Sequence, residues 1–136
     1  MAFETKNFYV ARKHGLAKSE FTVECNVMAG MNVSKVLSVS LGCSRGASEV
    51  LNGIINYSGV VDTKVVFIGE DGQLNTISSM CPFSSKFESE DIENGQVAII
   101  NLKIIDHNIE SVNGEAIKIS VILEQSGCII ANKEVH

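Results

Sequence analysis

Hydrophobic and polar side chains alternate along most of this chain, and the alternation is clearest between residues 50 and 87. In the middle of that stretch one parity is apolar apart from Gly59 and Thr63, and the other is largely polar. The apolar set is Ile55, Tyr57, Val61, Val65 and Phe67, and the polar set is Asn56, Ser58, Asp62 and Lys64. A period of two residues is that of a β-strand with one buried face and one wetter face. The pattern therefore predicts a long strand over residues 54–68.

Turn residues border this strand on both sides. Asn52-Gly53 precedes it and residues 69–72, Gly-Glu-Asp-Gly, follow it. Both supply residues that tolerate positive φ, as tight hairpin turns require. A further strand is predicted over residues 74–81. This strand is expected to end at Pro82. Proline has no N–H to donate to the hydrogen-bond ladder of a sheet, so it belongs at a strand end or at a sheet edge.

Two alternating segments precede this central unit. Residues 20–28 predict a strand, and residues 33–43 predict another. The expected inward side chains are Phe21, Val23, Cys25 and Val27 in the first, and Leu37, Val39, Leu41 and Cys43 in the second. Val33, Val36 and Leu37 also fit the face of a short helix, so periodicity leaves the start of the second segment open. Residues 44–46 predict a kink or a turn before the central unit.

Two more alternating segments follow. Residues 97–112 carry apolar side chains of both parities, which indicates either a strand buried on both faces or a strand with a β-bulge. Asn113-Gly114 is a strong hairpin signal. The returning strand places Ile117, Ile119, Val121 and Leu123 on one face. Ser126-Gly127 is expected to break it, leaving a short final strand over residues 128–131.

About eight strands with regularly spaced turns and no convincing long helix predict an all-β fold. We expect an antiparallel, jelly-roll-like β-sandwich, with a barrel as the second choice. The expected organisation is an N-terminal strand or arm over residues 1–18, one domain over residues 19–131 and a C-terminal tail over residues 132–136. A chain of 136 residues can bury a core of this kind without disulfides or a metal.

The charge balance argues against a nucleic-acid partner. Sixteen acidic against eleven basic residues give a formal net charge of -5, and the basic cluster of residues 12–14 with Lys18 is small. No stretch approaches the roughly 18 apolar residues of a membrane span, and no apolar run follows a basic segment at the N-terminus. We therefore expect a cytosolic protein with no nucleic-acid partner and no membrane span.

Residues that could carry catalysis or hold a metal are sparse. His14, His107 and His136 lie at no metal-ligand spacing with one another or with a cysteine. Asp106 precedes His107, but neighbours along a strand point to opposite faces. There is no nucleophile elbow and no phosphate-binding loop. We expect neither an enzyme nor a cofactor.

The four cysteines are far apart and include no C-x-x-C pair. Cys25 and Cys43 share the parity of apolar neighbours, which favours small buried side chains. The alternative is cross-linking between assembled chains, for which Cys128, near the C-terminus, and Cys25 are the candidates.

The N-terminal segment carries the aromatic residues Phe3, Phe8 and Tyr9, followed by Val10. This segment is either an edge strand of its own sheet or an arm that pairs with the sheet edge of a neighbouring subunit.

Six short motifs follow one another in an order that bears on identity. They are residues 35–39 (KVLSV), 49–53 (EVLNG), 59–61 (GVV), 64–72 (KVVFIGEDG), 82–84 (PFS) and 113–114 (NG). Together they resemble the SPOCS domain of spore-forming Firmicutes, over residues 20–127. The chain departs from that family at residues 29–32, where prolines are common, and at Phe67, where the family has tyrosine.

The resemblance implies a non-enzymatic protein-interaction module in assembly of the spore coat or spore envelope. Its partners would be other coat or envelope proteins, and it would lie in the mother-cell cytoplasm and then at the spore surface. The chain would be either a single-domain member or the first domain of a longer protein.

Two functions follow from these expectations. An adaptor would present a sheet edge or residues 82–87 to a coat partner, with Phe83 and Phe87 as anchors; the alternative for both phenylalanines is the core. A structural subunit would self-associate into a spore-surface layer or filament, through residues 3–10 and disulfides of Cys128 or Cys25. The adaptor rests on family analogy.

Overall fold

The computed structural model describes the backbone of residues 9–134 and the side-chain surroundings of residues 14–130. The strands are β1 Tyr9–Met28, β2 Val33–Leu51, β3 Ile54–Gly69, β4 Leu74–Glu88, β5 Val97–Asn113 and β6 Ala116–Glu134. No helix occurs in the part of the chain that the structure describes. The predicted all-β class is confirmed.

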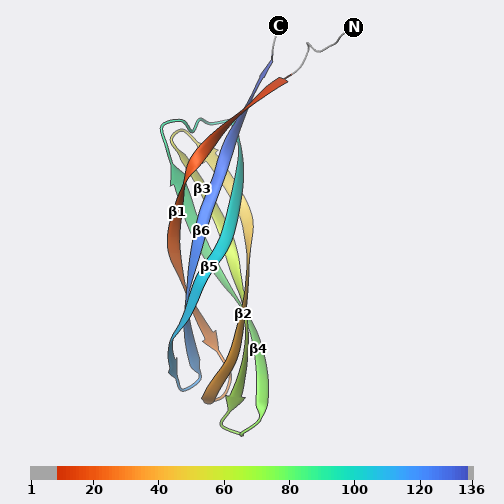
Figure 1. The fold of residues 1–136 in the computed structure, drawn as a ribbon, viewed down its shortest axis with the longest axis vertical. Coiled ribbons are helices and arrows are strands. Elements are labelled where there is room, and N and C mark those ends of the chain that lie inside the picture. Colours follow the sequence, from red (N-terminus) through yellow and green to blue (C-terminus); the bar gives the residue numbers. More distant parts are fainter. Residues whose placement is uncertain (1–8, 135–136) are drawn as a thin grey trace, which may run out of the picture.

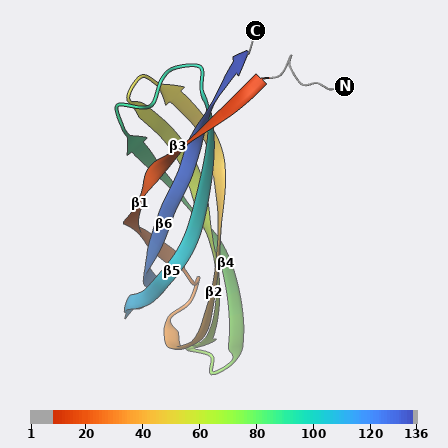
Figure 2. The ribbon, with the colours of Figure 1, turned by 45° about the horizontal axis from the view of Figure 1, so that its top comes forward.

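The strands form two antiparallel sheets of three strands each, in the orders β1-β6-β5 and β2-β3-β4. The sheets stack as an elongated sandwich (Figure 1), and a second view separates the two layers (Figure 2). Along one side β1 lies near β4, and along the other β2 lies near β5. Neither pair is hydrogen-bonded into one sheet, so the fold is not a closed barrel.

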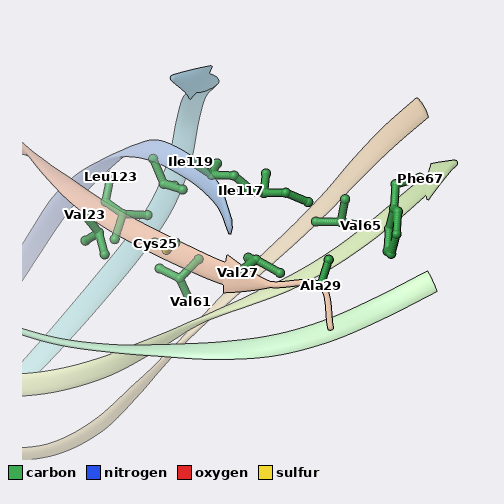
Figure 3. Packing of buried hydrophobic residues seen from close by; sticks show 11 residues of the cluster. Val23, Cys25, Val27, Ala29, Val61, Val65, Phe67, Ile117, Ile119 and Leu123 are labelled. Atoms are coloured by element: carbon green, nitrogen blue, oxygen red, sulfur yellow. The ribbon is translucent and has the colours of Figure 1, made fainter. Parts of the chain in front are cut away.

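The predicted alternation builds the core between the sheets. The larger cluster of buried side chains comes from β1, β3 and β6 and from Ala29 directly after β1, and Figure 3 draws its buried members as sticks. Its members are Val23, Cys25, Val27, Ala29, Val61, Val65, Phe67, Ile117, Ile119, Val121 and Leu123. A second cluster consists of Ile55, Tyr57, Phe87, Ile92, Ile100 and Ile129. Removing this apolar surface from water is the main favourable term in folding.

The predicted count of about eight strands is not confirmed, because residues expected to break strands lie inside them. β2 continues past residues 44–46 with a register shift between Arg45 and Ser48. β4 continues through Pro82 to Glu88, and β6 continues through residues 126–127. Pro82 lies on an edge strand, as its missing N–H predicted.

Bulges also decide which side chains face inward. β5 shifts register between Ile104 and Asp106 and again between Ile109 and Ser111, which agrees with the predicted bulge and not with a strand buried on both faces. Ile99, which precedes both shifts, is 41% exposed. A shift after Val36 in β2 leaves Leu37 47% exposed, and its predicted inward position is wrong. β2 is a strand from Val33 onward, so the alternative of a short helix is also wrong.

Hydrogen bonds tie the connecting loops across both ends of the sandwich. At the end that holds residues 29–32, the Val33 N–H donates to the carbonyl of Gly114 over 3.0 Å. At the other end, the Gly53 N–H donates to the Ile92 carbonyl over 2.8 Å. Gly53, Gly72 and Gly114 all take positive φ, as the predicted turns require.

The expected domain boundaries do not coincide with element ends. Residue 18 lies inside β1, where the register shifts between Leu16 and Ser19, and residue 132 lies inside β6. The predicted N-terminal segment and C-terminal tail therefore contribute backbone to the same sheet.

Candidate functional site

The N-terminal segment pairs with its own chain from Tyr9 onward. Tyr9 lies opposite Glu134 and Val10 opposite Lys133, so the two ends form a ribbon that extends past the rest of the sandwich (Figure 1). Phe3 and Phe8 lie outside the described residues. A partner-binding role for the four predicted side chains of this segment stays a prediction.

Phe83 and Phe87 both point between the sheets. Phe87 is buried in the second cluster and stacks on Tyr57, with ring centroids 5.9 Å apart. Phe83 is half-buried, lies 5.5 Å from the ring of Phe21 and packs against both clusters. Their positions agree with the core alternative, because anchors for a partner need exposed rings.

The cysteines are free thiols in four different environments on four strands. Cys25 is 1% exposed, whereas Cys43, Cys81 and Cys128 are half-buried. Burial, the neighbouring Cys81 thiol and the Glu24 carboxylate together raise the pKa of Cys25 to about 12. A cross-link from Cys25 to another chain would require the sandwich to open, while Cys128 can be reached from outside.

The raised pKa of Cys25 predicts a loss of stability in alkali. The unfolded chain releases this proton from about pH 9, whereas the folded chain holds it to about pH 12. The contribution to stability is therefore full below pH 9 and falls as the pH rises through that window. In urea unfolding, Cys25→Ala should show a shallower decline than the parent chain. Cys43 and Tyr57, whose pKa values burial also raises, remain in both proteins, so equal declines would contradict the assignment.

A buried glutamine joins the two sheets through a polar network. The Gln125 Oε1 accepts hydrogen bonds from the Tyr57 hydroxyl over 2.5 Å and the Ser85 hydroxyl over 2.8 Å. Its Nε2 donates to the Ser19 hydroxyl over 3.0 Å and to the Lys86 carbonyl over 2.8 Å. Sequence reasoning missed this residue, although Gln125 continues the inward parity of Leu123.

A pocket of about 430 Å³ opens beside this network, between the bulge of β1 and the end of β4. His14 Nε2 lies 2.9 Å from the Asp91 carboxylate at its rim, and both side chains are more than half exposed. The buried amide of Gln125 in its wall already makes four hydrogen bonds. It therefore offers a ligand no free donor or acceptor of its own.

The other candidate chemistry is equally limited. The Asp106 carboxylate accepts a hydrogen bond from the backbone N–H of His107 over 2.8 Å, which is a local backbone contact. Among residues 9–134, no group of three or more His, Cys, Asp or Glu is placed to hold a metal ion. No helix of the described chain is long and apolar enough to cross a membrane.

The free sheet edges are a further surface with a capacity to bind. β1, β2, β4 and β5 each pair on one side only, and proteins normally protect such edges with bulges, charges or proline. β1, β2 and β5 contain register shifts and charged residues. β4 pairs with β3 without a shift from Leu74 to Glu88, and residues 74–85 contain no charged side chain.

Comparisons with known proteins add no candidate. No protein-family model matches the chain, and no curated protein and no solved structure is similar to it. The resemblance to the SPOCS domain therefore stays a prediction from short motifs. What the geometry adds is one regularly paired edge strand, uncharged over residues 74–85, on an all-β sandwich.

Proposed function

We propose that this chain is a non-enzymatic protein-interaction module that binds an extended segment of a partner protein along the free edge of β4, over residues 74–81. Strand addition takes its affinity from main-chain hydrogen bonds and its specificity from alternate side chains. The observation that carries the proposal is the unbroken register of β4 on an edge without charges. Pro82 marks the end of the proposed binding segment, because it lacks a donor.

The side chains of β4 suit this role on both faces. Ile77 and Cys81 pack against the larger core cluster and hold the strand in place. Leu74 and Met80 point outward and are 65% and 69% exposed. A partner strand would therefore meet a fixed backbone edge flanked by two apolar side chains, with small Thr and Ser side chains between them.

The assembly in which this module acts is proposed from the sequence resemblance alone. It points to coat or envelope proteins of a spore as partners, and to residence in the mother-cell cytoplasm and then at the spore surface. The edge of β4 fits a partner that supplies a strand, whichever assembly supplies it.

A photo-crosslinking experiment tests the proposed edge. A benzoylphenylalanine is placed at Ser78 on β4 and, as the matched control, at Ser40 on β2, since both positions are exposed. We expect adducts in sporulating cells from Ser78 and not from Ser40. A second change, Met80→Lys, puts a charge on the edge and should reduce the adducts at least about tenfold. Equal adducts from both positions, or adducts insensitive to Met80→Lys, would refute the β4 edge.

The second candidate is the self-associating structural subunit of a spore-surface layer or filament. One observation favours it: β5 exposes Val97, Ile99, Ile105, Ile109 and Val112, half of the large exposed apolar side chains among the described residues. Light scattering of the purified chain separates the two functions. A monomer or dimer supports the adaptor, whereas polymers support the structural subunit.

A further inference from the structure

Two cysteines from different sheets meet at one side of the sandwich. Cys25 lies on β1 and Cys81 on β4, and Cys81 packs against the buried cluster that contains Cys25. The Cys81 thiol also donates to the backbone carbonyl of Glu24 over 3.4 Å. The pair therefore spans the gap between the two sheets where no backbone ladder connects them.

The two thiols differ in their access to solvent. Cys25 is part of the buried cluster, flanked by Val23 and Val27 (Figure 3). Cys81 is half-buried on an edge strand. An oxidant in solution can reach Cys81, and Cys25 can be reached through Cys81. This order matters because the pKa of Cys25 is raised, so Cys25 is a poor first nucleophile.

We propose that Cys25 and Cys81 are the site of a reversible disulfide that links the two sheets. With a small disulfide as oxidant, the Cys81 thiolate attacks one of its sulfurs, and one small thiol leaves. Cys25 then gives up its proton and attacks the Cys81 sulfur, which releases the second small thiol. One S–S bond forms between the strands as the bond of the oxidant is broken. The two cysteines lose two electrons and two protons, and the small disulfide gains them.

The placement of the strands permits this bond. A disulfide requires sulfurs about 2.05 Å apart, and the Cys81 sulfur lies 3.4 Å from the carbonyl oxygen of Glu24, the residue before Cys25. Both cysteines are on edge strands. Bringing the two sulfurs together therefore requires a shift of β1 and β4, and the central strands β3 and β6 stay in place. The bond would hold together the side of the sandwich that includes the free edge of β4.

Oxidation of the folded chain with oxidised glutathione tests the site. We expect the four free thiols to fall to two, and peptide mapping to join the peptide of Cys25 to that of Cys81. The link closes a loop of about 55 residues in the unfolded chain, so the Tm should rise by about 10 °C and return on reduction. Cys43→Ser is the matched control and should form the same link.

Two variants keep the test decisive. Cys81→Ser should form no internal disulfide and show no rise in Tm. In Cys25→Ser, the oxidant should stop at a mixed disulfide between glutathione and Cys81. Circular dichroism establishes that each variant keeps its sheets before oxidation. The proposal is overturned if the folded chain gives no Cys25–Cys81 peptide, or if that peptide appears only after denaturation.

Discussion

Gly127→Ala is expected to lower the free energy of unfolding by about 3 kcal/mol, at the upper end of what overpacking costs. A Cβ built at Gly127 would overlap the carbonyl oxygen of Ile99 and lie 3.3 Å from the Cα of Ile100. Both atoms belong to the backbone of β5, which pairs with β6 at this point. A side chain can change rotamer to make room, but a paired backbone must move as a strand. The expected loss is read from urea unfolding.

Gly42→Ala is the matched control for this prediction. Gly42 also lies within a strand, β2, but a Cβ there meets nothing within 4 Å. Its cost should stay within about 0.5 kcal/mol. If both substitutions cost the same, close approach of β5 is not the reason for glycine at position 127.

Gln125→Leu is expected to cost about 3 kcal/mol of unfolding free energy, because it removes the amide on which the polar network depends. The buried Tyr57 hydroxyl and the Lys86 carbonyl lose their partner in the network. Leucine fills a similar volume, so the loss measures unsatisfied polar groups more than an empty space. Thermal and urea unfolding should report the same direction.

The companion change Tyr57→Phe separates hydrogen bonding from packing. In the parent chain Tyr57→Phe removes the donor to Gln125 and should destabilise. In the Gln125→Leu background the same change removes a donor that no longer has its acceptor, so it should cost little or stabilise. The double variant should therefore be more stable than the sum of the single effects, by about 1 kcal/mol. Additive effects would show that the hydroxyl and the amide act independently.

Local patterns were sufficient for the buried face of β3 and for the hairpin turns at Gly53 and Gly114. The parity of Ile55, Val61 and Phe67 is inward because a strand turns alternate side chains to opposite faces, whatever its partners are. The turns at Gly53 and Gly114 need positive φ, which glycine adopts without a steric cost. These features depend on neighbours in sequence.

Local patterns could not predict the β-bulges or the sheet edges, because both depend on how one strand pairs with another. Leu37 has the parity of Val39, yet it points outward because an extra residue is accommodated against β3. Pro82 predicted either the end of a strand or the edge of a sheet. Only the pairing of β4 with β3 alone shows that Pro82 lies at a sheet edge.

The alternation of apolar residues, the turn glycines and the all-β class were determined by the sequence itself, since each reflects the geometry of a few consecutive residues. Tertiary structure alone decided that the Cys81 thiol lies against the backbone of Glu24 beside Cys25, that Gln125 bonds to Tyr57, and that β4 is an edge strand paired regularly with β3 alone. Each of these joins residues far apart in the chain. Their proximity follows from how the two sheets pack, and a period of two residues carries no information about that packing.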